Sequence, residues 1–201
     1  MQIIHGPRPK GKILPSQLPE FENGDWLVQR KFNGHKNTFF YDGKNVHFFN
    51  KGKTFLRYKT PSLFQKQLSA LKLDSGSYWF DSELLDVRVP DTIVLYDVLQ
   101  VAGKHLVGVS QEERLQLLNH MCGSPQTRCS LGVALQITEN IWLAECWGKD
   151  FTLHYEEYLH LDLIEGLVLR EKSAPLDNFG LMAYETNSQI RCRKESKNYR
   201  F

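Results

Sequence analysis

The sequence predicts an α+β fold in which mixed, largely antiparallel sheets are flanked by helices. Runs rich in aromatic and β-branched residues dominate the chain, and helical segments interrupt them in clumps instead of alternating with every strand. With 201 residues and 41% hydrophobic content, the chain is long enough to bury a substantial core. We therefore expect one domain that spans residues 1–201.

The elements of the first half follow from local patterns. Residues 1–25 are rich in proline and glycine and predict an extended N-terminal arm. Residues 26–30 predict a strand that leads into Lys31, and a β-hairpin is expected where residues 37–41 and 46–49 flank an Asp-Gly turn. Further on, the apolar spacing predicts a short helix over residues 61–71, and two more strands are expected at 77–85 and 92–99.

The second half begins with a capping signal. Ser110 stands three residues before Glu113 and ahead of an apolar-periodic run, so a helix should open there. Four strands, at 133–138, 141–147, 166–170 and 189–193, and a helix near 155–161 complete the expected elements.

Charge and cysteine content leave several partner classes open. A net charge of +2 permits binding to a polyanion without requiring it. The four cysteines form no Cys-x-x-Cys pair, which favours a reducing, cytoplasmic setting. We expect neither secretion nor membrane spanning, because the sequence has no signal-peptide pattern and no run of about 18 apolar residues.

Lys31 is the first candidate for chemistry, because a lysine that ends a strand and precedes Asn33-Gly34 is well placed to act as a nucleophile. A lysine amine with its reference pKa of roughly 10.4 is protonated at neutral pH, so nearby cations or a dry site must lower that pKa. The cations that we expect to contribute are Arg30, Lys36, Arg191, Arg193 and Lys194.

Four further strings follow Lys31 at intervals: Phe80-Asp-Ser-Glu83-Leu, Val94-Leu-Tyr96-Asp97-Val-Leu, Glu165-Gly-Leu-Val-Leu-Arg170 and Ile190-Arg191-Cys-Arg193-Lys194. In this order they resemble the motifs of the covalent nucleotidyltransferase superfamily, in particular the adenylation domain of ATP-dependent DNA and RNA ligases. The resemblance runs from Trp26 to Arg193. It implies a ligase nucleotidyltransferase fold, related to the ATP-grasp type, with a central nucleotide cleft and no C-terminal OB-fold within this chain.

The resemblance implies a role for each matching residue. Lys31 would take AMP from ATP, Glu83 would hold the ribose hydroxyls, and Glu165, with Glu83, would bind Mg²⁺ or Mn²⁺. Gln29 would contact the amino group of adenine through its side-chain amide, and Tyr96 and Phe80 are both candidates to stack on the purine. The other implied nucleotide contacts are Arg30, Asn33, Lys36, Arg191, Arg193 and Lys194, with Lys51 at the 5′-phosphate of the nucleic acid.

Several departures from the family pattern keep alternatives open. Asn33 replaces the usual Asp, and Arg191 and Arg193 replace two lysines, an exchange that changes hydrogen-bonding geometry. The leading expectation is an ATP-dependent ligase, with DNA ahead of RNA, that acts as a monomer on nicked duplex or RNA ends. A minimal RNA ligase, a capping-type guanylyltransferase and a catalytically inactive nucleic-acid-binding module are the alternatives. Because the chain ends eight residues after Arg193, we expect a minimal ligase, a clamp domain supplied by a partner, or a natural protein that is longer.

Overall fold

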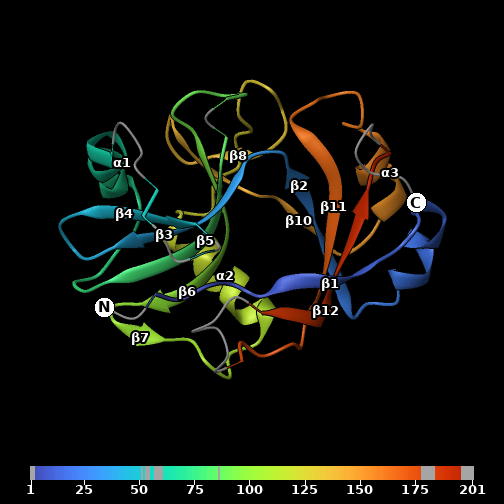
Figure 1. Ribbon diagram of the computed structural model, residues 1–201, viewed down its shortest axis with the longest axis horizontal. Helices are drawn as coiled ribbons and strands as arrows, with labels where there is room; N and C mark the ends of the chain where they lie inside the picture. Colours follow the sequence, from blue (N-terminus) through green and yellow to red (C-terminus); the bar gives the residue numbers. More distant parts are fainter. Residues whose placement is uncertain are drawn as a thin grey trace.

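Two β-sheets face each other in the computed structural model, which describes residues 3–50, 52, 55–56, 61–85, 87–177 and 184–195 (Figure 1). Sheet A, on the right of Figure 1, has the strand order β1-β12-β11-β2-β10. Sheet B, on the left, has the order β4-β3-β5-β6-β9-β8, with β7 paired to β6. The pairings are antiparallel except β1 with β12 and β6 with β9, so the predicted mixed α+β class is confirmed.

Sheet A combines segments from both ends of the chain. Its strands are β1 (Arg8–Lys12), β2 (Trp26–Phe32), β10 (Cys146–Trp147), β11 (Ile164–Glu171) and β12 (Glu185–Arg193). The N-terminal residues therefore do more than form an extended arm, because they supply the edge strand β1 and a 3₁₀ helix, η1 (Pro15–Phe21). Strand β2 continues to Phe32, which places Lys31 within the strand and not after it.

Sheet B is built mainly from the middle of the chain. Its strands are β3 (His35–Tyr41), β4 (Val46–Asn50), β5 (Tyr78–Leu84), β6 (Ile93–Val101), β7 (Lys104–His105), β8 (Leu135–Gln136) and β9 (Ile141–Leu143). The predicted hairpin is confirmed, since β3 and β4 pair and Asp42 accepts hydrogen bonds from the backbone N–H groups of Lys44 and Asn45. Gly43 supplies the positive φ that this turn requires.

The predicted strand over residues 141–147 is wrong as a single element. Its first part, β9, pairs in parallel with β6 in sheet B, and its last part, β10, pairs with β2 in sheet A. The chain thus crosses from one sheet to the other at residues 144 and 145. Of the expected strand at 133–138, only β8 is regular.

The helices cover the outer faces of the sheets. They are α1 (Pro61–Gln67), which runs on into the 3₁₀ helix η2 (Leu68–Ala70), α2 (Gln111–Met121) and α3 (Phe151–Glu156). The capping box at Ser110 is confirmed, because its hydroxyl accepts from the Glu113 N–H while the Glu113 carboxylate accepts from the Ser110 N–H. The helix expected near 155–161 lies earlier in the chain, at α3. No helix of the described residues is long and apolar enough to cross a membrane.

Strand alternation separates the two faces of sheet A. Val28, Leu167 and Leu169 pack with Phe151 of α3 and Leu18 of η1 on the outer face. Side chains one position away along each strand therefore point to the other face, toward sheet B. This arrangement leaves polar side chains of both sheets directed into the space between them.

Candidate active site

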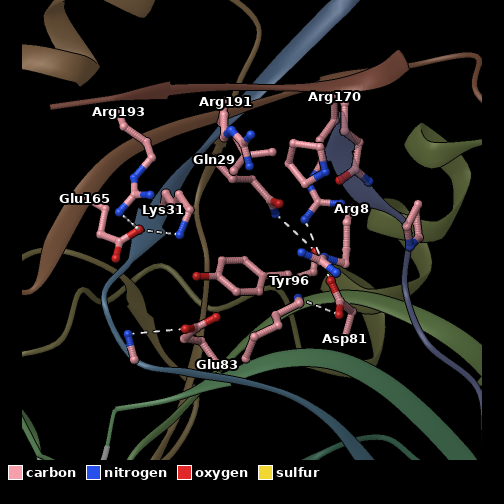
Figure 2. A pocket seen from close by; sticks show the side chains of 16 residues that line it. Arg8, Gln29, Lys31, Asp81, Glu83, Tyr96, Glu165, Arg170, Arg191 and Arg193 are labelled. Carbon is pink, nitrogen blue, oxygen red and sulfur yellow. Dashed lines mark hydrogen bonds and ion pairs between the residues drawn. The ribbon is translucent and has the colours of Figure 1, made fainter. Parts of the chain in front are cut away.

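A cavity of about 280 Å³ lies between the two sheets and collects most of the predicted site residues (Figure 2). Its lining comes from sheet A, sheet B and the N-terminal segment, and consists of Pro7, Arg8, Pro9, Gln29, Lys31, Gly34, Lys36, Asp81, Glu83, Tyr96, Glu165, Val168, Arg170, Gln189, Arg191 and Arg193. This size is close to the lower end of the range for small-molecule pockets. A polar, cation-rich cavity of this kind suits an anionic ligand.

The register of sheet A places its polar side chains in rows. Lys31 pairs with Gly166, which in turn pairs with Arg193, and this forms the first row. The second row is Gln29, Val168 and Arg191, two residues further along each strand. Arg170 and Gln189 form a third row beyond it. The rows explain why residues as distant in the sequence as Gln29 and Arg193 converge on one cavity.

A β-bulge turns Glu165 toward Lys31. Ile164 pairs with Phe32 and Gly166 pairs with Lys31, so Glu165 is an extra residue in β11. Gly166 has φ +134°, and a Cβ at this position would lie 2.1 Å from the carbonyl oxygen of Cys192. Only glycine fits this close approach, and the Glu-Gly pair therefore has a conformational basis.

Lys31 and Arg193 both approach the Glu165 carboxylate. Lys31 Nζ forms an ion pair with Glu165 Oε2, and an Arg193 guanidinium nitrogen lies 3.2 Å from the same oxygen. All three side chains are only partly buried, with exposed fractions between 19% and 28%, so a ligand can reach them. The predicted nucleophile and the predicted metal ligand are thus in direct contact.

On the side of sheet B, Lys36 lies between two acids. Its Nζ is 2.5 Å from Asp81 Oδ1, and it pairs across the strands with Glu83. Glu83 accepts a hydrogen bond from the Gly34 N–H at 3.2 Å. Burial raises the pKa of Glu83 to about 7, although the charges of Lys36 and Lys31 oppose the increase. Glu83 is therefore a carboxyl whose charge changes near neutral pH.

Tyr96 crosses the centre of the cavity, between the two ends that Figure 2 shows. Its hydroxyl accepts a hydrogen bond from the Phe32 N–H at 3.1 Å, and Lys36 Nζ lies 4.9 Å from its ring centroid. Burial raises the pKa of this hydroxyl, so Tyr96 stays neutral. A fixed aromatic ring lining a cavity offers a stacking surface for a base.

Gln29 brings an open hydrogen-bond acceptor to the cavity. Its Nε2 donates to the Tyr96 carbonyl at 3.1 Å, while its buried Oε1 has no partner among the residues that the structure describes. A buried amide oxygen without a partner is costly, and a ligand N–H would relieve that cost. The side chain therefore fits the amino group of a purine such as adenine.

Arg30 does not reach the cavity. It is 1% exposed, donates to Glu145 and Glu157 at 3.0 and 2.8 Å, and lies between the rings of Trp147 and Tyr158. Because Arg30 is adjacent to Lys31 in a strand, its side chain points to the opposite face. Arg30 therefore has a structural role. It is neither the predicted nucleotide contact nor the predicted cation beside the Lys31 amine.

Three other predicted contacts also lie away from the cavity lining. Phe80 is fully buried in the core of sheet B, with its ring 5.6 Å from that of Phe39. Asn33 donates its amide to the Asp162 carbonyl, and Lys194 donates to the carbonyls of Leu159 and Leu161. Lys51, expected at the 5′-phosphate, lies outside the described residues.

Sequence reasoning missed three charged residues of the lining. Asp81 and Arg170 stand two residues from Glu83 and Val168 in their strands, so strand alternation was a usable signal for both. Arg8 had no such signal, because its place depends on the long-range pairing of β1 with β12.

The residues present fit a purine nucleotide and a divalent cation to different extents. The open Gln29 acceptor, the Tyr96 ring and the cations of β12 match a base and a phosphate. Among the described residues, no group of three His, Cys, Asp or Glu side chains forms a preassembled metal site. Magnesium commonly binds through one or two carboxylates together with substrate phosphates, which Glu165 would satisfy.

Comparison with solved structures identifies the fold. A mycobacterial DNA ligase D complexed with ATP superposes with a TM-score of 0.68 at 12% identity, over 94% of this chain and 60% of that one. A Lig E DNA ligase gives 0.54 at 13% identity, covering 95% and 70% of the two chains. The ATP-dependent ligase of bacteriophage T7, in complex with ATP, gives 0.57 at 12% identity, covering 91% and 67%.

These similarities extend over nearly all of this chain, which spans about 60% of the length of the mycobacterial ligase D chain. No protein-family model matches the sequence, and no curated protein matches it. The chain therefore has the ligase-type nucleotidyltransferase fold of ATP-dependent DNA ligases, as its two facing sheets, the cleft between them and these superpositions indicate.

Proposed function

We propose that the protein is an ATP-dependent polynucleotide ligase that works through a covalent lysyl-AMP intermediate. The observation that carries the proposal is the meeting of Lys31, Glu165 and Arg193 at one end of a cavity that also holds Tyr96 and Gln29. Nucleotidyl transfer needs a nucleophile, a carboxylate that binds a metal, a cation that binds phosphate and an aromatic ring on which the base stacks.

Lys31 supplies the nucleophile in the first step. Its deprotonated Nζ attacks the α-phosphorus of ATP, a P–N bond forms, and the bond from the α-phosphorus to the bridging oxygen breaks. Pyrophosphate leaves with the electron pair, and the amine loses its proton. Arg191 and Arg193 on β12 are placed to neutralise the phosphate charge that develops. A bound Mg²⁺ would add further charge neutralisation at Glu165.

Two later steps join the nucleic acid. A 5′-phosphate oxygen attacks the AMP phosphorus, the P–N bond breaks, and Lys31 regains its amine. The 3′-hydroxyl of the end to be joined then attacks the adenylated 5′-phosphate, loses its proton and displaces AMP. The three solved structures compared above are DNA ligases, which supports DNA over RNA as the polymer.

The ion pair of Lys31 with Glu165 also favours a second candidate, a nucleic-acid-binding module without turnover. An amine that is engaged by a carboxylate is not free to attack a phosphorus atom. In addition, Asn33 is turned to the Asp162 carbonyl and not into the cavity. Such a module would retain the basic cleft and bind phosphates, with an affinity that falls as salt rises.

Labelled ATP separates the two candidates. The protein is incubated with ATP labelled at the α-phosphate and with Mg²⁺, and then run on a denaturing gel. We expect label on the wild type, none on Lys31→Ala, and wild-type labelling on Lys66→Ala, which removes an exposed lysine of α1 far from the cavity lining. An unlabelled wild type would favour the binding module. Labelled GTP in a parallel lane tests the base, and transfer of GMP alone would contradict the choice of adenine.

A ligation panel tests the polymer. Nicked DNA, nicked duplexes with RNA strands and single-stranded RNA are each supplied with a 5′-phosphate and a 3′-hydroxyl. We expect sealing of nicked DNA first, with a clamp partner added in a second series. Sealing of RNA ends alone would replace DNA by RNA in the proposal.

A further inference from the structure

The N-terminal segment connects the two sheets at one end of the cavity. Ile4 is buried in the core of sheet B, and the His5 ring lies 3.2 Å from the Thr38 hydroxyl. Gly6 passes so close to Asp81 that a Cβ there would lie 2.7 Å from the carboxyl carbon. The next residues enter β1, where Arg8 N–H donates to the Tyr184 carbonyl at 3.0 Å. This path fixes the backbone of Arg8 against the cavity.

Arg8 and Lys31 stand at opposite ends of that cavity. Lys12 pairs with Arg191, which belongs to the second row of sheet A, and Arg8 lies four residues before Lys12 in β1. At roughly 3.3 Å per residue, the Arg8 backbone is about 13 Å beyond this row, on the side away from Lys31. Figure 2 shows the same order, with Lys31, Glu165 and Arg193 at one end, Arg8 and Asp81 at the other, and Tyr96 between them.

No acid of the described residues forms an ion pair with the Arg8 guanidinium. Glu165 pairs with Lys31 and Arg193, while Asp81 pairs with Lys36 at 2.5 Å and lies 3.9 Å from Arg170. Within the part of the chain that the structure describes, no hydrogen bond or ion pair involves the Arg8 side chain. A guanidinium offers five N–H donors and no acceptor, so these donors are available to a ligand in the cavity.

We propose that Arg8 binds the edge of the nucleotide base and closes the base end of the pocket. The inference rests on the proposed function, which places the α-phosphate at Lys31. The nucleoside then extends past Tyr96 and Gln29 toward Arg8, whereas the β- and γ-phosphates leave on the other side of the α-phosphate. A purine presents ring nitrogens along its edges, and these accept hydrogen bonds from arginine. Arg8 is therefore a specificity-determining contact that lies outside the ligase-like motifs.

The experiment measures nucleotide affinity by calorimetry on three variants without relying on turnover. Arg8→Ala removes the donors, Arg8→Lys keeps the charge without the planar fork, and Lys10→Ala removes an exposed cation of the same strand that does not line the cavity. We expect Arg8→Ala to weaken ATP binding by about tenfold to a hundredfold, as for hydrogen bonds from charged groups. Lys10→Ala should bind ATP like the wild type, and tripolyphosphate should bind all variants alike.

Analogues that lack one ring nitrogen locate the contact. The loss caused by Arg8→Ala should disappear with one of 1-deaza-, 3-deaza- and 7-deaza-ATP, because that analogue no longer offers the acceptor. An equal loss with all three analogues would overturn the base-edge contact, as would wild-type ATP affinity in both Arg8 variants. If the wild type binds no ATP, the proposed function fails and this inference fails with it. If the wild type binds ATP and Arg8→Ala binds it with the same affinity, the inference about Arg8 is overturned and the proposed function is not.

Discussion

Lys31 Nζ and Glu165 Oε2 form an ion pair across the irregular pairing of β2 with β11. The bulge at Glu165 is what brings the two groups together, since regular alternation would turn the carboxylate to the other face. In this arrangement the amine is held by the carboxylate. In the proposed mechanism, Glu165 would exchange Lys31 for another cation before the amine attacks, and the acid would thereby control the nucleophile.

Removal of the Glu165 carboxylate should therefore affect activity far more than folding. We expect Glu165→Gln to lower the rate of AMP transfer by about a hundredfold, because the proposed metal contact and the anchor for Arg193 would both be lost. The melting temperature should change by only a few degrees, since Glu165 is partly exposed and its ion pairs contribute about 1 kcal/mol or less. Rates come from single-turnover labelling and stability from thermal unfolding. If the rate of AMP transfer and the melting temperature of Glu165→Gln both fell strongly, this prediction would be wrong.

Glu83 should give the protein a pH-dependent stability. Its pKa changes from 4.5 to about 7 on folding, chiefly through burial, so the folded state prefers the protonated form. The stabilisation is fully present below pH 4.5 and is lost as the pH rises through 7. Replacement by Gln removes this titration and keeps an acceptor for the Gly34 N–H.

We expect the difference in unfolding free energy between Glu83→Gln and the wild type to rise by on the order of 3 kcal/mol between pH 4.5 and pH 8. Urea unfolding at closely spaced pH values measures it. A difference that stays flat across this range would show that Glu83 does not titrate near neutral pH.

The buried pair of Asp97 and Arg114 should be a main determinant of stability. Both side chains are at most 1% exposed, and Arg114 donates to both carboxylate oxygens at distances from 2.9 to 3.2 Å. Arg114→Ala leaves a buried carboxylate unpaired, so we expect a loss of about 3–5 kcal/mol in urea unfolding. The double variant Asp97→Leu with Arg114→Met should lose less than Arg114→Ala. A single-variant loss below about 1 kcal/mol would contradict the role of this pair.

Tyr96 should contribute its ring to the ligand and its hydroxyl to the fold. Tyr96→Phe keeps the ring but leaves the Phe32 N–H without its acceptor, so we expect lower stability and near wild-type ATP affinity. Tyr96→Leu removes the stacking surface and should weaken ATP binding by about 1–3 kcal/mol. Calorimetry measures the binding and thermal melting the stability. Equal ATP affinity in the wild type and Tyr96→Leu would exclude stacking on this ring.

Elements with local signals could be predicted from the sequence. The strand that carries Lys31, the hairpin at Gly43 and the cap at Ser110 depend on nearby residues, and each is found in the structure. Strand alternation could also have excluded two wrong contacts. Arg30 is one residue from Lys31 and Phe80 is three from Glu83, and odd separations place both side chains on the opposite face.

Features that depend on long-range strand pairing could not be predicted from local sequence signals. The division of residues 141–147 between two sheets depends on which strands β9 and β10 meet, and the sequence pattern is the same for one strand or two. The position of Arg8 likewise depends on β1 pairing with β12, about 180 residues later in the chain. Only the assembled cleft shows that these segments share one cavity with Lys31.

Intact-protein mass spectrometry after incubation with ATP and Mg²⁺ tests whether Lys31 becomes adenylated. We expect that the wild type gains the mass of one AMP, that peptide mapping places it on Lys31, and that Lys31→Ala gains none. A wild type that carries no AMP at any pH from mildly acidic to alkaline, or that carries it on another residue, would show that Lys31 is not the nucleophile.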